Sequence, residues 1–287
     1  MVELYCSWCK GLPESTEALK LIKESELFAG IELSNTDGQA DKILEAGLKV
    51  SIHNPIREFK MTLDNEKFIQ VLNTNPKIID SCNKSSLSFV SFHTNYIPSL
   101  DRTIPYSRVL KNTVKNLNEL DTFFSKQILF ETSCGFGENE YLPFSESMFN
   151  CTSPDFAKKI LSKTNSGVLI DISHVISSAS AHKLYNNYPK GVKDFFLDYL
   201  DACAKRTYEL HLNSTKLNEN GFYKDTHSKF VPTKKETQLA FECATQAINS
   251  CPKLEIVVLE IEPKLEPIAH AKLMIKQAQL FVKTVKF

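Results

Sequence analysis

The chain has 287 residues, of which 42% are apolar, and its 34 Lys and Arg residues balance 34 Asp and Glu residues. A net charge of zero does not indicate a broadly basic nucleic-acid-binding surface, although it leaves a local basic patch open. Eight cysteines are too few for a disulfide scaffold in a chain of this length. We therefore expect reduced thiols, several of them buried.

The apolar runs and the N-terminus predict a cytoplasmic protein without a membrane anchor. No stretch approaches the roughly 18 consecutive apolar residues that a membrane-spanning helix needs. The first residues, MVELYCSWCKGLPES, lack the basic region and apolar run of a signal peptide. Cys6 and Cys9 form one Cys-x-x-Cys spacing, which we interpret as structural because no second pair accompanies it.

Short β-rich runs alternate with helix-like stretches, which is typical of βα units and a parallel sheet. The helix-like stretches include one with Ser107 as its N-cap and one with Pro267 in its first turn. No Gly-rich turn follows the first run, which disfavours an open doubly wound sheet. We predict an α/β fold of the (β/α)8 TIM-barrel type, with residues 1–287 as a single domain. Its eight strands are expected at 2–6, 28–33, 48–53, 86–93, 128–131, 167–171, 207–212 and 255–260.

Side chains that can bind metal ions stand at the ends of six successive predicted strands. TIM-barrel enzymes place their chemistry at the C-terminal strand ends. A single His or Asp there is often only a hydrogen-bonded rim residue or the N-cap of the next helix, but six in succession favour a metal centre. From the third strand to the eighth, these residues are His53, His93, Glu131, Asp171, His211 and Glu260.

Three further candidates lie beside the strand ends. His174 follows Asp171 in the sequence DISH, and Asp225 and His227 occur together in DTHS. One ion binds three to six such groups, so nine candidates with four carboxylates predict two or three divalent ions and a bridging carboxylate. Ligands of this kind without a thiolate suit iron, manganese or zinc. Cys134 follows Glu131 by three residues; it could face the pocket, but we favour a small buried loop residue.

The order and spacing of these candidates resemble the xylose-isomerase-like TIM barrels over nearly the whole chain. Within that group, the order His, His, Glu, Asp-x-x-His, His, Asp-x-His, Glu is similar to that of endonuclease IV, a trinuclear zinc enzyme of abasic DNA. The segments ETSCGFG and ELHLNST also resemble that family.

A second resemblance is to the multinuclear non-heme iron-dependent oxidative enzymes, the family of the methanobactin-maturation oxidase. RTYELHL is similar to that family's xxEIHL, DTHSKFVP to its DTHxxxVP, and residues 141–182 to its helix, strand and following segment. The chain departs from the family at His174, where Asn is usual, and at Thr215, where a second His is usual. We favour this family because the likeness extends to connecting segments as well as to the ligands.

The favoured resemblance implies an oxidoreductase with two or three iron ions, with zinc or manganese as alternatives and O2 as co-substrate. It implies oxidative modification of a precursor peptide, at a cysteine, in natural-product maturation, with a separate protein as a partner for peptide recognition. One metal would be held by His53, His93 and Glu131, and Glu131 would bridge to a second. Asp171, His211 and Glu260 would complete the second site, and His174, Asp225 and His227 would form a third. Glu131 is the predicted catalytic bridge. His182 stands at the position of the family's NH histidine, and we expect it either to contact substrate or transfer protons, or to be a surface histidine at the start of a helix.

Other functions stay open at this point. A zinc phosphodiesterase like endonuclease IV would act on abasic DNA through a metal-bound hydroxide, and would make nucleic acid a partner. If the chain is a non-catalytic binding subunit, metal ions would occupy only part of the ligand set. A sugar isomerase fits the fold but does not need His53, His93 or the pair Asp225 and His227. None of these functions calls for a membrane partner.

Overall fold

The computed structural model describes residues 2–8, 15–34, 39–56, 59, 61–94, 105–134, 151–185, 188–261 and 265–286. The strands are β1 (Glu3–Trp8), β2 (Gly30–Leu33), β3 (Lys49–Ile52), β4 (Phe89–His93), β5 (Gln127–Glu131), β6 (Gly167–Asp171), β7 (Thr207–Leu212), β8 (Ser214–Leu217), β9 (Tyr223–Ser228) and β10 (Ile256–Leu259). The helices are α1 (Thr16–Glu24), α2 (Gln39–Glu45), α3 (Phe68–Thr74), α4 (Pro76–Lys84), α5 (Tyr106–Phe123), α7 (Pro154–Leu161), α8 (Ile172–Tyr185), α9 (Val192–Cys203), α10 (Lys235–Ser250) and α11 (Pro267–Val285).

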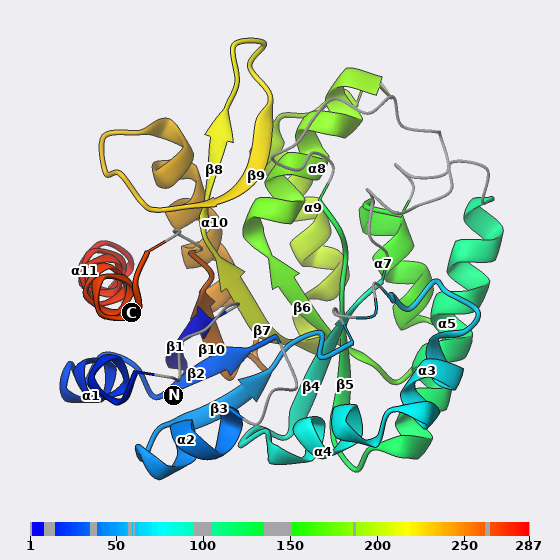
Figure 1. Cartoon of the computed structure of the whole chain (residues 1–287). Coiled ribbons are helices and arrows are strands. Elements are labelled where there is room, and N and C mark those ends of the chain that lie inside the picture. The colour runs from blue at the N-terminus through cyan, green and yellow to red at the C-terminus, as the bar shows by residue number, and fades with distance from the viewer. Residues whose placement is uncertain are drawn as a thin grey trace.

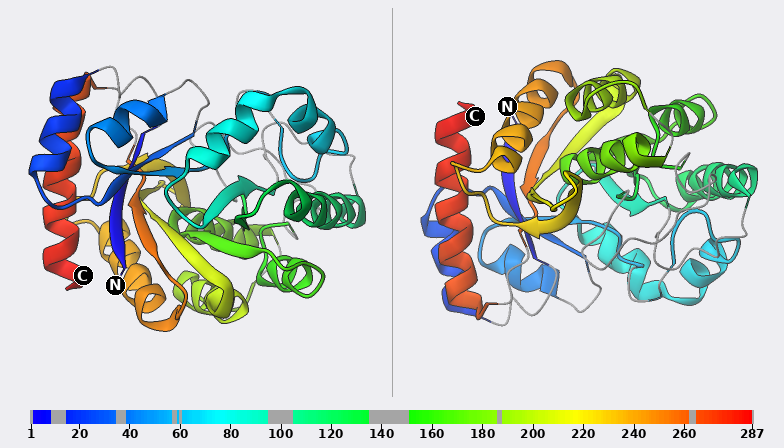
Figure 2. Two further views of the ribbon diagram at one scale, coloured as in Figure 1. Left: turned by 90° about the horizontal axis from the view of Figure 1, so that it is seen from below. Right: turned by 90° about the horizontal axis from the view of Figure 1, so that it is seen from above.

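All eight strands expected from the sequence are present and lie in one parallel sheet with the order β3-β2-β1-β10-β7-β6-β5-β4. The two edge strands meet through a parallel bridge between His53 and Ser91, and the Asn54 N–H donates to the Ser91 carbonyl over 2.7 Å. The sheet is therefore a nearly closed barrel surrounded by helices (Figures 1 and 2). This confirms the predicted TIM barrel.

The barrel interior has an apolar lower layer and a polar upper layer, because side chains alternate across each strand. The lower layer is a small buried cluster at the centre of the barrel. Its members are Tyr5, Leu87, Phe89, Leu129, Leu169, Ile256 and Val258. Moving two residues along a strand keeps the same face, so Leu129 is followed by Glu131, Leu169 by Asp171 and Val258 by Glu260. Strand alternation thus places these carboxylates directly above the apolar lower layer.

The helices pack their apolar faces on the outside of the sheet, where the larger core cluster lies. Pro267 begins α11 as predicted. The expected N-cap at Ser107 is wrong, because α5 begins at Tyr106 after Pro105 and has no side-chain cap. Cys6 is buried in β1, whereas Cys9 lies outside the described residues. No helix in the described ranges is long and apolar enough to cross a membrane.

A feature that the sequence reasoning missed is the hairpin of β8 and β9, an antiparallel pair separate from the barrel. It rises above the C-terminal strand ends beside α8 (Figure 1). The Tyr223 N–H donates to the Ser180 hydroxyl on α8 over 3.0 Å. The hairpin therefore positions the residues of β9 at the mouth of the barrel.

The lower layer makes a stability prediction. Leu129→Ala removes a fully buried side chain and should lower the free energy of unfolding by about 2–5 kcal/mol. Leu197→Ala on α9, where the side chain is 37% exposed, is the matched control and should change it by less than about 0.5 kcal/mol. Urea denaturation of both variants measures the difference. Equal effects at the two positions would contradict the assigned packing.

Candidate metal centre

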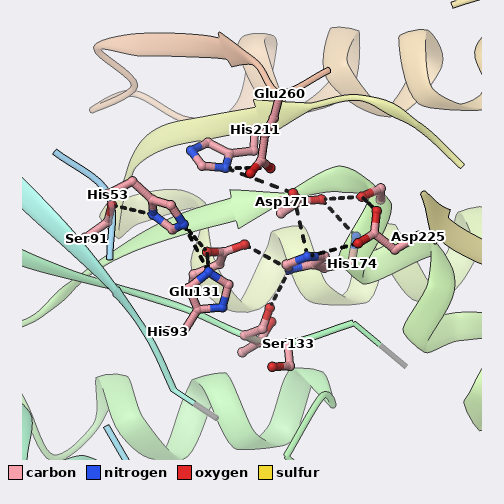
Figure 3. A network of polar contacts seen from close by, with 12 residues as sticks. His53, Ser91, His93, Glu131, Ser133, Asp171, His174, His211, Asp225 and Glu260 are labelled. Atoms are coloured by element: carbon pink, nitrogen blue, oxygen red, sulfur yellow. Dashed lines mark hydrogen bonds and ion pairs between the residues drawn. The ribbon is translucent and has the colours of Figure 1, made fainter. Parts of the chain in front are cut away.

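The structure brings the nine predicted ligands to one end of the barrel, and those labelled in Figure 3 point toward one another. His93 and Glu131 are paired across β4 and β5, and Asp171 and His211 are paired across β6 and β7. Strand register alone therefore makes neighbours of residues that are distant in sequence.

The first group of donors consists of His53, His93 and Glu131. The two Nε2 atoms of the histidines lie 3.0 Å apart, and they lie 3.3 and 3.0 Å from Oε2 of Glu131. Nδ1 of His53 is 3.0 Å from the Ser91 hydroxyl, which fixes the ring so that Nε2 faces the group. Three donor atoms thus converge on one point.

Asp171 serves both as a helix cap and as a member of the site. Helix α8 begins directly after it, and its Oδ1 accepts the backbone N–H of His174 over 2.9 Å. This is the N-cap role that the sequence alone suggests for an Asp after a strand. Its Oδ2 is buried without a hydrogen bond and faces the centre. The hydrogen bond to Oδ1 therefore holds the other oxygen of Asp171, Oδ2, toward the donor groups.

His174 is held so that its two nitrogens face different neighbours. Nδ1 lies 3.0 Å from the Thr132 carbonyl and 2.8 Å from Oε1 of Glu131. Nε2 lies 3.5 Å from Oδ2 of Asp225 and 3.9 Å from Oδ2 of Asp171. Since a carbonyl only accepts hydrogen bonds, Nδ1 carries the hydrogen and Nε2 keeps a lone pair for a cation.

The hairpin supplies Asp225 and His227. Nε2 of His227 lies 3.1 Å from Oδ2 of Asp225, and its Nδ1 lies 3.6 Å from Oε1 of Glu260. The Ser173 hydroxyl is 2.7 Å from Oδ1 of Asp225 and 2.8 Å from Oδ1 of Asp171, which ties the hairpin to the barrel. His227 has a φ of 45°, a left-handed backbone that costs a non-glycine residue about 1 kcal/mol or more. This backbone angle places the imidazole beside the carboxylates.

His211 is surrounded by carboxylates, two of which the sequence reasoning missed. Its Nδ1 lies 3.2 Å from Oε2 of Glu260 and 4.0 Å from Oδ2 of Asp171. Its Nε2 lies 3.2 Å from Oε2 of Glu32 and 3.6 Å from Oε1 of Glu209. Glu32 and Glu209 are fully buried and lie inside strands rather than at their ends. The sequence signal for these two residues was a Glu inside an otherwise apolar strand, in GIEL and in TYELHL.

Two carboxylates are shared between neighbouring groups of donors. Groups of donor atoms that all lie within 4.8 Å of one another are formed by His53 with His93 and Glu131, by Glu131 with Asp171 and His174, and by Asp171 with His211 and Glu260. Glu131 and Asp171 each belong to two of these groups. Such sharing is the arrangement that bridging carboxylates provide in centres with more than one ion.

The donor set fits cations. Both oxygens of Glu131 and Oδ2 of Asp171 are buried without a hydrogen bond of good geometry. A buried carboxylate oxygen without a hydrogen bond is costly, and a metal ion would lower that cost by supplying positive charge. Imidazole nitrogens and carboxylate oxygens suit zinc, iron or manganese, whereas octahedral oxygen sites suit magnesium.

In the protein without metal, protons supply positive charge to the site. Burial disfavours the charged form of Glu131, but His93, His174 and His53 hold its pKa well below the usual range. Burial lowers the pKa of His53. For His174, burial is outweighed by Asp171 and Glu131, which raise its pKa. For His211, Glu32 and Glu260 likewise raise the pKa against burial.

His182 lies on α8, as His174 does, but it belongs to none of the donor groups described above. Its Nε2 is 3.3 Å from the Thr152 hydroxyl, and its ring packs 5.0 Å from that of Phe195. It lines a cleft of about 550 Å³ between α5, α7, α8 and α9, together with Lys158 and Asp198. The predicted role of His182 in substrate contact or proton transfer stays a prediction.

Comparison with known proteins defines the fold and leaves the chemistry open. No family model matches the chain. A UPF0276 protein from Psychromonas ingrahamii is 28% identical over 149 residues, which cover 50% of this chain and 46% of that protein. The chain thus matches about half the length of this curated relative.

Solved structures match over nearly the whole chain. A xylose isomerase domain containing protein from Salmonella typhimurium LT2 has a TM-score of 0.63 and 15% identity, covering 100% of this chain and 98% of that one. Endonuclease IV from Thermus thermophilus has a TM-score of 0.59 and 13% identity, covering 98% and 99%. The IOLI protein, described with a bound zinc atom, has a TM-score of 0.60 and 13% identity, covering 99% and 98%. The fold is that of the xylose-isomerase-like TIM barrels.

The shifted pKa values predict how stability depends on pH. The pKa values of His174 and His211 are raised in the folded protein, so their stabilising effect is present below the unfolded value of about 6.5 and lost as the pH rises through the folded value. Burial raises the pKa of Asp171 to about 7, so its ionisation near neutral pH also costs stability.

We therefore expect the thermal unfolding midpoint of the metal-free protein to decrease as the pH is raised from about 6 to about 8. Added metal should raise the midpoint more at the higher pH, because it displaces fewer protons there. Scanning calorimetry with and without metal measures both effects. A metal-induced increase that is larger at the lower pH would contradict this account.

Glu32 should act through His211. Glu32→Gln keeps the shape but replaces the carboxyl oxygen 3.2 Å from Nε2 of His211 with an amide, so we expect metal affinity to fall by about 10–100-fold. Glu45→Gln, at the end of α2, is the control and should leave affinity unchanged. Competition with a chromophoric chelator measures both. Wild-type affinity in Glu32→Gln would show that Glu32 does not orient His211.

Proposed function

We propose that the chain is a multinuclear iron-dependent oxidoreductase that uses O2 to oxidise a peptide, at a cysteine, during natural-product maturation. The observation that carries the proposal is the sharing of Glu131 and Asp171 between adjacent groups of donors, which suits two or three ions held side by side. The segment likeness of RTYELHL and DTHSKFVP to the iron-dependent oxidative family supports oxidation over hydrolysis.

The side chains of the site have distinct tasks in this proposal. Glu131 would connect two cations and screen their repulsion, and its Oε2 lies beside Nε2 of both His53 and His93. The Ser91 hydroxyl and the Thr132 carbonyl fix the rings of His53 and His174. Because the rotations of these rings are restricted, the donors are organised before metal binds.

Burial at the site supports chemistry that must exclude water. Glu131, Asp171 and His211 are at most 2% exposed, whereas the side chain of His93 is 13% exposed and that of His227 is 20% exposed. Substrate would therefore approach from the side of His93 and His227, at the open end of the barrel. Bound iron would supply one-electron exchange, with O2 accepting the electrons removed from the peptide.

A zinc phosphodiesterase acting on abasic DNA is the second candidate. The imidazole of His174 favours it, since this is where the chain departs from the oxidative family and agrees with the endonuclease IV pattern. The balance of 34 basic and 34 acidic residues supports DNA binding less well, because phosphate contacts need clustered Lys and Arg.

Two substitutions separate the predicted bridge from the predicted substrate contact. Glu131→Gln should lower metal affinity by about 100-fold or more, because a neutral amide cannot bridge two cations. His182→Asn should leave the metal content unchanged, because His182 contacts Thr152 and Phe195 in the cleft. Metal analysis of both variants after gel filtration measures the outcome. Full metal content in Glu131→Gln would contradict the assigned bridge.

The reaction class is tested with the iron-loaded protein and a pool of synthetic peptides that contain cysteine. Oxygen uptake that occurs with this pool, and not with the same pool carrying serine in place of cysteine, is the expected result. Mass spectrometry then locates the change in the peptide. Incision of an abasic-site duplex by the zinc-loaded protein, with no oxygen uptake by the iron-loaded form, would replace this proposal with the phosphodiesterase.

A further inference from the structure

The part of the centre nearest the hairpin contains a thiol. The Sγ atom of Cys134, a nitrogen of His174 and a carboxylate oxygen of Asp225 all lie within 4.8 Å of one another. Cys134 follows β5 by three residues, so it comes from the strand that carries Glu131. Its side chain is partly buried, whereas the other cysteines in the described residues are fully buried. Cys134 is thus the described cysteine that meets potential ligands.

The neighbours of Cys134 are oriented toward a common point. Thr132 accepts a hydrogen bond from Nδ1 of His174, which leaves Nε2 toward Asp225. Ser173 binds Oδ1 of Asp225 and leaves Oδ2 toward the histidine. Independently, Oδ2 of Asp171 is buried without a hydrogen bond and lies 3.9 Å from the same Nε2. This buried carboxylate oxygen without a hydrogen bond lies beside the imidazole of His174, and it indicates that the space around that imidazole suits a cation.

We propose that Cys134 binds, through its thiolate, the metal ion that His174 and Asp225 hold. This inference rests on the proposed metal centre and changes its third position from a nitrogen and oxygen site to a mixed site with sulfur. The thiol proton leaves to solvent as the sulfur–metal bond forms. His227, whose Nε2 is 3.1 Å from Oδ2 of Asp225, stands beside the group as a further donor. Two nitrogens, one oxygen and one sulfur suit tetrahedral zinc or iron(II).

Cobalt(II) tests this assignment without any activity assay. A thiolate bound to cobalt gives a near-ultraviolet charge-transfer band that nitrogen and oxygen ligands do not give. Titration of the metal-free, reduced full-length protein with cobalt should produce this band. In Cys134→Ser and Cys134→Ala the band should be lost, while cobalt still binds to the remaining positions, as counted by equilibrium dialysis.

Cys251→Ser is the matched control. Cys251 lies before β10, at the end of the barrel opposite the centre, and is buried. This variant should keep the full band. Circular dichroism melts of all variants establish that they are folded, and the serine variant keeps nearly the size of the thiol.

The outcomes distinguish this inference from the proposal on which it rests. If wild-type protein binds cobalt without the band, or if the band persists in folded Cys134→Ser, the Cys134 assignment is wrong while the metal centre stands. If wild-type protein binds no cobalt, zinc or iron, the metal centre itself is wrong and the assignment falls with it.

Discussion

Positive charge is the constraint on which the upper end of this barrel depends. Six carboxylates are buried there within reach of one another or of the same imidazoles, namely Glu32, Glu131, Asp171, Glu209, Asp225 and Glu260. Buried carboxylates repel one another and lose hydration, so each needs a proton, an imidazolium or a metal ion. The raised pKa values of His174 and His211 show that protons supply part of this charge in the metal-free protein. Metal ions would supply it by binding the imidazole lone pairs in place of those protons.

The fold produces this arrangement through alternation and register. Apolar residues such as Leu129 and Leu169 fill the floor, and the next inward residue on the same strand reaches the mouth of the barrel. Parallel pairing then sets His93 beside Glu131 and Asp171 beside His211. Helix α8 and the β8–β9 hairpin supply the remaining residues of the site, because α8 begins at the end of β6 and the hairpin returns over the centre. A stable barrel and an assembled site therefore have the same cause.

Much of this could be predicted from the sequence. Strands of four to six residues can be recognised in the sequence by their Val, Ile, Leu or Phe residues. A strand that ends in His, Asp or Glu places its last side chain at the C-terminal end of the barrel. The convergence of residues from different strands followed from the fold class. Asp171 can be both the N-cap of a helix and a member of the site, since one oxygen caps α8 and the other faces the centre.

The remaining features depend on contacts that sequence periodicity does not encode. Glu32 and Glu209 lie within strands, and only their distances to His211 reveal their place in the site. The hairpin is short and polar, so its strands lack the apolar alternation that marks a buried sheet. The sequence left two positions open for Cys134, one facing the pocket and one in a buried loop, because its proximity to Asp225 depends on how that hairpin folds back. Tertiary structure, rather than local propensity, decides all three.

The most direct test of the central claim is elemental analysis of the full-length protein purified without oxygen and without added metal. We predict two or three metal ions per chain, since the shared carboxylates connect adjacent groups of donors. We expect these ions to be iron because RTYELHL and DTHSKFVP resemble the iron-dependent oxidative family. Two or three moles of zinc would keep the multinuclear centre and redirect the function toward phosphodiester hydrolysis. A chain that contains no metal, and that binds none after anaerobic addition of iron or zinc, would contradict the account.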